Sequence, residues 1–236
     1  MIRAENLVKR YNKLLAVNDI SIKVEKGEIV GLLGPNGAGK TTTFYMIVGL
    51  TKPTSGSIYK DNINITRFPI HKRASFGIAY LPQEPSVFRK LTVYENLLLI
   101  LSVSGKKMDK GKIRNILDNF EISNIARKRC ELLSGGEARK VEIARSLILD
   151  PDFLLLDEPF SGIDPKSVSE MKNMISNLKN MGVGILMTDH NVRDALKIID
   201  RAYIISNGSM LFSGSPREIT DHIEVKKEFL GNDFSL

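Results

Sequence analysis

A glycine-rich segment between a continuous apolar run and a helical stretch constrains the fold of this chain more than any other feature. The apolar run is Ile29–Leu33, and the helical stretch covers residues 42–50. The segment matches the pattern G-x-x-x-x-G-K-[ST] in full, and it reads Gly34, Pro35, Asn36, Gly37, Ala38, Gly39, Lys40 and Thr41. A buried strand, such a loop and a helix in this order bind phosphate through converging backbone N–H groups. The chain is therefore predicted to fold around a strand–loop–helix unit that holds a nucleoside triphosphate.

Further apolar runs recur along the chain with helical stretches between them. Together with the first, they cover residues 29–33, 78–81, 153–156, 183–187 and 202–205. The runs are continuous rather than alternating, which is typical of strands buried on both faces of a parallel sheet. We therefore predict an α/β fold with a P-loop NTPase (RecA-like) core. Phosphate loops belong at the carboxyl ends of such strands.

Two regions depart from this pattern. Residues 1–28 and 56–59 resemble short, half-exposed strands and predict an antiparallel β layer. Residues 88–150 show helical faces and no buried-strand run, which predicts an inserted α-helical subdomain. We predict one domain over 1–236. Its nucleotide-binding core with the β layer covers 1–87 and 151–215, the helical subdomain covers 88–150, and the C-terminal tail covers 216–236. Asn207-Gly208 between apolar segments predicts a two-residue hairpin turn.

Composition excludes several classes of protein. The 236 residues are 42% hydrophobic and 26% charged, as in ordinary globular proteins. The single cysteine, Cys130, cannot form an internal disulfide, which favours a reducing compartment. The longest apolar stretch, 97–101, is far shorter than the about 20 residues that span a bilayer. We expect no membrane span in this chain.

The net charge of +7 has two interpretations. Basic residues cluster within 106–114 and 127–129, a pattern that can bind nucleic acid or anionic lipid headgroups. No aromatic residues are interleaved with them as base-stacking platforms would require. We therefore expect a lysine-rich solvent-exposed surface and no nucleic-acid partner.

Two carboxylates end the apolar run 153–156. Burying the Asp157 carboxylate at a strand end would be energetically costly without a cation, so we expect it to interact with Mg²⁺. Lys40 is expected to bridge the β- and γ-phosphates of the nucleotide, and the Thr41 hydroxyl to ligate the metal. Glu158 points away from its neighbour and can polarise the attacking water. The alternative for Glu158 is a carboxylate that favours the start of a helix.

Three isolated side chains are weaker candidates. Gln83 follows the run 78–81 and could ligate Mg²⁺ or hold a water, although surface glutamines are commonly inert. His190 follows the run 183–187 and could contact the γ-phosphate. Tyr11 could stack on a nucleotide base, or it could simply be a packing residue.

A Ser-Gly-Gly turn lies before the acidic strand. Ser134, Gly135 and Gly136, followed by Glu137, leave bare backbone N–H groups at the start of a helix, which forms a second anion-binding surface. One nucleotide does not need two such surfaces from one subunit. We therefore predict that two copies of the chain face each other and complete each other's sites.

Taken in order, these motifs resemble those of the ATP-binding-cassette ATPases over nearly the whole chain. The resemblance implies a head-to-tail homodimer around two ATP molecules, with Ser134 to Glu137 acting on the nucleotide of the other subunit. It implies that Glu158 is the general base, that His190 and Lys40 assist catalysis, and that Asp164 lies at the dimer interface. The ATP-binding residues so implied are Tyr11, Gly34, Pro35, Asn36, Gly37, Ala38, Gly39, Lys40, Thr41, Thr42 and Gln83. The Mg²⁺ ligands so implied are Thr41, Gln83 and Asp157.

The segments 31–46, 80–84, 86–89 and 229–236 are similar to the lipopolysaccharide-export ATPases of Gram-negative bacteria. That similarity implies that Phe88 and Arg89 dock on membrane subunits, from the cytoplasmic face of the inner membrane. Burial of Phe88 in the core of the cassette is the alternative.

Other functions remain open from the sequence. The same type of ATPase cassette could drive another transporter, such as a branched-chain amino-acid importer. A soluble cassette ATPase acting on ribosomes or DNA usually carries two cassettes or a long coiled coil, and this chain has one cassette and no sustained heptads. A nucleotide-binding scaffold is disfavoured by the presence of both Glu158 and His190.

Overall fold

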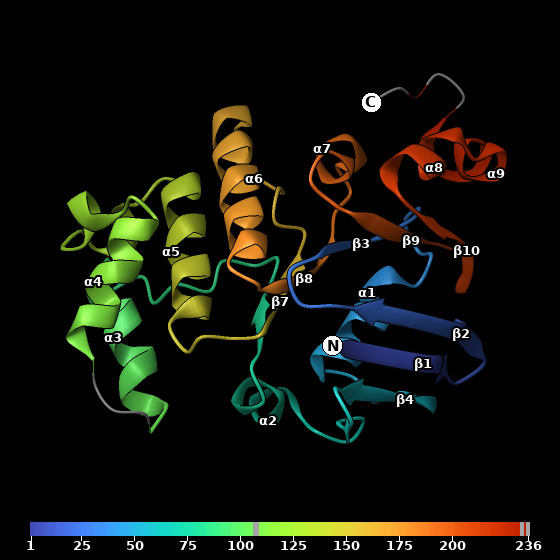
Figure 1. Cartoon of the computed structure of the whole chain (residues 1–236), viewed down its shortest axis with the longest axis horizontal. Coiled ribbons are helices and arrows are strands. Elements are labelled where there is room, and N and C mark those ends of the chain that lie inside the picture. Colours follow the sequence, from blue (N-terminus) through green and yellow to red (C-terminus); the bar gives the residue numbers. More distant parts are fainter. Residues whose placement is uncertain (106–108, 232–233, 235–236) are drawn as a thin grey trace.

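The structure is a computed structural model that describes residues 1–105, 109–231 and 234. Within these residues, two β-sheets share a core in which helix α1 (Lys40–Val48) packs between them, and most of the other helices lie on the opposite side of the larger sheet (Figure 1). The larger sheet has the order β10-β9-β3-β8-β7-β6. Its strands are β3 (Ile29–Leu33), β6 (Ile78–Leu81), β7 (Phe153–Asp157), β8 (Gly184–Thr188), β9 (Arg201–Ser206) and β10 (Ser209–Gly214).

The strands β3 and β6–β9 are parallel, as the continuous apolar runs predict. Every residue of β3, β7 and β8 is buried. Along β7, Phe153 and Leu155 pack on the side of the smaller sheet, and Leu154 and Leu156 pack on the opposite side. The α/β fold with a P-loop NTPase core is thus confirmed.

The predicted hairpin joins β9 to β10. Asn207 and Gly208 both have positive φ, at 49° and 78°, and the two strands pair antiparallel. Asparagine and glycine tolerate this left-handed conformation, which two-residue hairpin turns require.

The smaller sheet is antiparallel, with the order β2-β1-β4-β5. Its strands are β1 (Ile2–Tyr11), β2 (Leu14–Val24), β4 (Ser55–Lys60) and β5 (Ile63–Asn64). The prediction of short strands is wrong for β1 and β2, which have 10 and 11 residues. Their register shifts near Asn6 and Asp19, two positive-φ residues whose side chains hydrogen-bond at 2.8 Å. Such bulges break the alternation of the sequence while the strand continues.

The helices fall into two groups. Helices α3 (Val93–Val103), α4 (Lys110–Asn119) and α5 (Gly135–Leu147) form a helical arm, on the side of the larger sheet away from the antiparallel sheet (Figure 1). Short turns η1 (Ser123–Ile125) and η2 (Cys130–Leu132) precede α5. The remaining helical elements are α1 (Lys40–Val48), α2 (Ile70–Ser75), α6 (Pro165–Asn180), α7 (Val192–Leu196), α8 (Pro216–Asp221), α9 (Ile223–Val225) and η3 (Lys226–Leu230).

The arm agrees with the predicted helical character of 88–150, although the exact subdomain boundaries stay a prediction. Lys106 and Lys107 of the basic cluster, and part of the predicted C-terminal tail, lie outside the described residues. None of the helices in the described part of the chain is long and apolar enough to cross a bilayer.

Candidate active site

The phosphate loop leaves β3 and enters α1. Gly34 has a φ of 148°, and a Cβ at this position would lie 2.0 Å from the carbonyl oxygen of Ile205, so only glycine fits beside β9. The Lys40 Nζ donates to the carbonyl oxygens of Gly34 and Pro35 at 2.8 and 2.9 Å. Burial lowers the pKa of Lys40, and the nearby Glu158 charge opposes that shift. The lysine is therefore held over the loop, beside the acidic strand end.

A cavity of about 480 Å³ lies next to this loop. Its lining consists of Tyr11, Leu14, Leu15, Ala16, Gly37, Gly39, Lys40, Thr41, Thr42, Asn207 and Gly208. Tyr11 is 45% exposed, so it is available to a ligand rather than packed in the core. The cavity therefore places the predicted base-stacking residue and the phosphate loop around one space.

The hairpin turn is part of this cavity, which the sequence did not indicate. Gly208 N donates to Ala38 O at 3.0 Å, and Asn18 N donates to Gly208 O at 2.7 Å. The Asn-Gly signal predicted the turn but carried no information on its position beside the phosphate loop.

Asp157 ends β7 in a buried position, 4% exposed. It accepts hydrogen bonds from the Thr188 hydroxyl at 2.8 Å and from the Tyr80 hydroxyl at 3.5 Å. Burial is the main cause of its raised pKa, and burial likewise raises the pKa of Tyr80. The carboxylate thus has two neutral donors and no neighbouring full positive charge at hydrogen-bond distance within the described chain. No sequence pattern indicated the contacts of Thr188 and Tyr80 with Asp157, because both depend on the register of adjacent strands.

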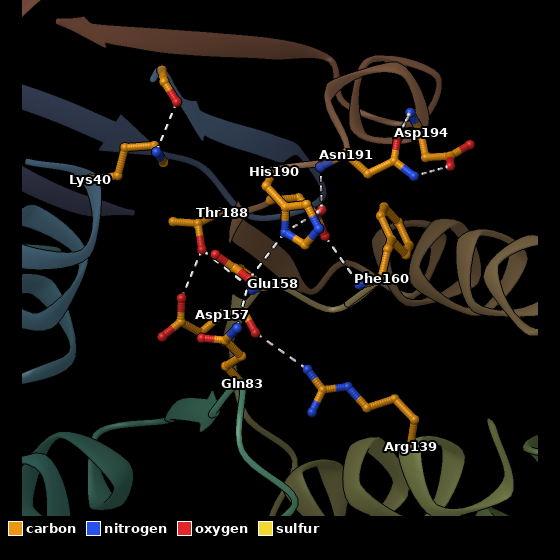
Figure 2. A network of polar contacts seen from close by, with 12 residues as sticks. Lys40, Gln83, Arg139, Asp157, Glu158, Phe160, Thr188, His190, Asn191 and Asp194 are labelled. Carbon is orange, nitrogen blue, oxygen red and sulfur yellow. Dashed lines mark hydrogen bonds and ion pairs between the residues drawn. The ribbon is translucent and has the colours of Figure 1, made fainter. Parts of the chain in front are cut away.

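Glu158 lies between two other predicted site residues, Gln83 and His190 (Figure 2). Its Oε2 accepts from Gln83 Nε2 at 2.8 Å and lies 3.1 Å from His190 Nδ1. The three side chains follow the neighbouring strands β6, β7 and β8, whose carboxyl ends meet at one edge of the sheet. No helix begins at Glu158, since α6 starts at Pro165, which removes the helix-start alternative.

The backbone of Glu158 is held in an unusual conformation. Its φ is 47°, which is uncommon for a residue other than glycine. Its N–H donates to Thr188 O at 3.0 Å. Strain of this kind costs of the order of 1–3 kcal/mol and persists only where the surroundings enforce it.

The Ser-Gly-Gly turn caps α5. Ser134 Oγ accepts from Glu137 N at 3.3 Å, and Glu137 Oε2 accepts from Ser134 N at 2.8 Å. Ser134 and Gly135 are exposed, whereas Gly136 is buried. Glu137 also pairs with Lys128 at 3.2 Å, so its carboxylate serves its own helix. The exposed residues are accordingly better placed than Glu137 to reach a nucleotide of another subunit.

The sequence from residue 17 to residue 161 matches the ABC transporter family. The chain belongs to this family. It is 48% identical to the lipopolysaccharide export system ATP-binding protein LptB of Haemophilus influenzae, over 100% of this chain and 99% of that protein.

Two solved structures show the same fold. The ADP conformation of MJ1267, an ATP-binding cassette of an ABC transporter, has a TM-score of 0.89 at 29% identity, and the match covers 98% of both chains. The dimeric post-hydrolysis state of the cassette MJ0796, bound to ADP and Pi, has a TM-score of 0.79 at 25% identity, over 92% of this chain and 99% of that one. As an ABC cassette, this chain binds nucleotide and hydrolyses ATP in a transport system.

Asp164 caps α6 of the cassette. Its Oδ1 accepts from Lys166 N at 3.0 Å and from Ser167 N at 3.1 Å. Hydrogen bonds from Ser167 are the main cause of its lowered pKa. The predicted interface role stays a prediction, and the capping role is an addition that the Asp-Pro sequence could have indicated.

Gly136 lies against the same helix start. A Cβ on Gly136 would lie 2.3 Å from Ser167 Oγ. The Ser-Gly-Gly turn therefore lies close to the first turn of α6, which Asp164 caps, within one subunit.

Three polar residues on one face of α5 hold the segment 82–86, on both sides of Gln83. Arg139 donates to Pro82 O at 2.8 Å, to Glu142 Oε2 at 3.0 Å and to Asp157 O at 3.3 Å. Glu142 Oε1 accepts from Ser86 N and, at 3.2 Å, from Ser86 Oγ. These residues were not predicted from the sequence, because a charged residue on a helix ordinarily indicates a solvated face.

Arg145 extends the contact to the predicted docking residue. It donates to Ser86 O at 2.6 Å, and its guanidinium lies 5.3 Å from the centroid of the Phe88 ring. Phe88 is 44% exposed and lines a groove of about 350 Å³, which rules out burial in the core. Arg89 is also exposed.

Proposed function

We propose that this cassette is the ATP-hydrolysing motor of a transporter that extracts lipopolysaccharide from the inner membrane and exports it to the outer membrane. The observation that carries hydrolysis is the Glu158 carboxylate between Gln83 and His190, on the sheet edge that holds the phosphate loop. The transported molecule is inferred from the 48% identical relative, whose name assigns it to lipopolysaccharide export.

Glu158 acts as the general base in this proposal. Among the described residues, the side-chain hydrogen bonds of Glu158 go to Oε2, which leaves Oε1 to take a proton from the attacking water. Lys40 exchanges the carbonyl oxygens of its own loop for the β- and γ-phosphates. His190 stabilises charge that develops on the γ-phosphate. Tyr11 stacks on the adenine, and the loop from Gly34 to Thr42 surrounds the phosphates.

The residues present also fit Mg²⁺. Asp157 is a buried carboxylate whose two recorded donors are neutral hydroxyls, and a hard cation favours such an oxygen ligand. We propose that Asp157, the Thr41 hydroxyl and the Gln83 amide oxygen hold the ion. Bound there, Mg²⁺ would neutralise phosphate charge.

Two copies are proposed to assemble head to tail in the ATP-bound state. The exposed Ser134 and Gly135 lie at the start of α5, where helix N–H groups attract a γ-phosphate. Asp164 would face the partner across the same interface. The dimeric ADP and Pi complex of MJ0796 supports assembly of this kind.

Membrane subunits are proposed to dock at Phe88 and Arg89. The exposed aromatic ring borders an open groove, and aromatic and arginine side chains are frequent anchors of interfaces. Docking there would keep the cassette at the cytoplasmic face of the inner membrane.

The decisive experiment is reconstitution with the membrane proteins that co-purify with the full chain. Proteoliposomes should release labelled lipopolysaccharide when ATP is added, and Lys40→Ala should abolish this release. The alternative, a branched-chain amino-acid importer, would instead show ATP-driven leucine uptake. Leucine uptake without lipopolysaccharide release would reject the proposed substrate but keep the ATPase assignment.

A further inference from the structure

Asp189 is a buried carboxylate that has no role in the chemistry proposed above. It lies between Thr188, the last residue of β8, and the predicted catalytic His190, and it is 1% exposed. Burial is the main cause of its raised pKa. A carboxylate in such a position is costly unless its oxygens are satisfied by hydrogen bonds.

Its two oxygens hold two different segments of the chain. Oδ2 accepts from Phe160 N at 3.1 Å, and Oδ1 accepts from Asn191 N at 2.7 Å. The first segment begins with Glu158, and the second begins with His190. Asp189 therefore connects the turn after the general base to the turn after the catalytic histidine.

The same carboxylate also lies beside the histidine ring. Asp189 Oδ1 is 3.9 Å from His190 Nδ1, the nitrogen that contacts Glu158 Oε2. The imidazole is thus flanked by two carboxylates on its Nδ1 side.

The strained backbone of Glu158 gives the hydrogen bonds of Asp189 a structural role. The positive φ of Glu158 must be enforced by neighbouring contacts, and the bond to Phe160 N fixes the chain two residues further on. The bond to Asn191 N fixes the chain one residue after His190. Both partners are N–H donors, so the residue between them needs two acceptor oxygens. Aspartate offers two, whereas asparagine offers one oxygen and one donor group.

We propose that Asp189 is a positioning residue that sets the approach of His190 to Glu158 by anchoring the backbone after each of them. The inference rests on the proposed roles of Glu158 and His190. It predicts that loss of one acceptor oxygen slows hydrolysis and leaves nucleotide binding intact, because the phosphate loop lies on a different strand.

Asp200 provides a matched control. Its Oδ2 also accepts a backbone N–H from another segment, that of Ile29 at 2.8 Å, and its Oδ1 pairs with Lys179. Ile29 is the first residue of β3, so this bond lies at the opposite end of the sheet from the site. Asp200→Asn makes the same chemical change without touching the catalytic loops.

The test compares Asp189→Asn with Asp200→Asn in the full chain. We expect kcat for ATP hydrolysis to fall by roughly 10²-fold in Asp189→Asn, the scale of a misplacement near 1 Å. The KM for ATP and the melting temperature should stay near those of the parent. Asp200→Asn should keep the parent kcat. If Asp189→Asn does not fold, Asp189→Ser, which is smaller and has one hydroxyl acceptor, should show the same division between kcat and KM.

Glu158→Gln, measured in parallel, distinguishes failure of the Asp189 positioning role from failure of the proposed general base. A parent rate in Asp189→Asn beside an inactive Glu158→Gln overturns the positioning role alone. A parent rate in Glu158→Gln removes the proposed base and the Asp189 inference with it. If kcat, ATP affinity and melting temperature fall together in both Asp189 variants, Asp189 is a scaffold residue and the inference is wrong.

Discussion

The catalytic edge of the larger sheet and the helical arm hold their functional residues by different means. At the sheet edge, Asp157 and Glu158 contact Thr188 on the adjacent strand, and Asp189 contacts Phe160 in the turn that follows β7. In the arm, the exposed Ser134 caps its own helix, α5, by accepting a hydrogen bond from Glu137 N. The connection from the arm to the segment 82–86 around Gln83 depends on polar side chains of α5 that contact residues more than 50 positions away.

The two regions are therefore sensitive to different kinds of substitution. Buried strands on both sides fix the sheet edge, so single substitutions there should change chemistry more than stability. The arm is attached to the sheet edge through Arg139, Glu142 and Arg145, so a single polar substitution there should change stability or docking more than chemistry. The predictions below test this division.

The largest effect is expected at the sheet edge. Glu158→Gln preserves shape but cannot accept the proton, and loss of a general base typically costs about 10²–10⁴-fold in rate. ATP binding, measured by equilibrium titration, should remain. Glu170→Gln is the control, because its salt bridge with Lys140 lies on the surface and such pairs contribute little. Hydrolysis at the parent rate by Glu158→Gln, in complex with its partner, would contradict the base assignment.

The next effect is a loss of stability in the arm. Glu142→Gln leaves the Arg139 guanidinium buried without its counter-charge, and breaking such a pair typically costs about 3–5 kcal/mol. Denaturant unfolding should show this loss. Glu131→Gln, at an exposed pair with Arg129, should change the free energy of unfolding by less than about 1 kcal/mol. An equal loss in both variants would mean that the buried network does not attach the arm.

The sequence predicted the sheet edge better than the arm for a physical reason. Continuous apolar runs identify parallel strands, and strand ends gather whatever polar residues follow them, so Gln83, Glu158 and His190 could be placed together in advance. The contacts of Arg139 and Glu142 could not be predicted in the same way, because their partners come from a loop whose path no local pattern encodes. The lengths of β1 and β2 were missed for a related reason, since bulges at Asn6 and Asp19 interrupt the pattern without ending the strand.

An intermediate effect on assembly is expected at Phe88. Because the ring is exposed, Phe88→Ala should leave the melting temperature of the isolated cassette unchanged. If the ring is an interface anchor, the binding free energy for the membrane subunits should weaken by about 2 kcal/mol or more. Less of the membrane subunits should then co-purify with the variant. Leu132→Ala, at an exposed apolar residue of η2 outside the groove that Phe88 lines, is a comparator for nonspecific loss of apolar surface. A lower melting temperature with normal co-purification would contradict the docking role.

A smaller effect is expected where the two helix starts meet. Gly136→Ala places a Cβ 2.3 Å from Ser167 Oγ, and overpacking of this kind typically costs about 1–3 kcal/mol. Removing the hydroxyl with Ser167→Gly should restore much of the stability, measured by thermal unfolding of the double variant. Additive losses in the double variant would show that the contact with Ser167 is not the cause.

The smallest effect is the pH dependence of the α5 cap. Hydrogen bonding from Ser134 N–H is the main cause of the lowered pKa of Glu137, and Lys128 lowers it further. Because the folded-state pKa lies below the ordinary value of 4.5, this carboxylate stabilises the fold above that pH. The stabilisation is lost as the pH falls through the lowered folded-state pKa.

Glu137→Ala should therefore lower the free energy of unfolding at pH 7 by up to about 1 kcal/mol, the scale of one helix cap. Glu137→Gln should lower it less, because its amide oxygen can still accept from Ser134 N and only the charge toward Lys128 is lost. Both differences should shrink below pH 4.5, where the parent carboxylate is increasingly protonated on unfolding. A difference that grows toward acid would reverse the sign and show that the carboxylate is destabilised in the fold. ATP hydrolysis by Glu137→Gln near the parent rate would further indicate that this residue serves its own helix rather than the nucleotide of the partner.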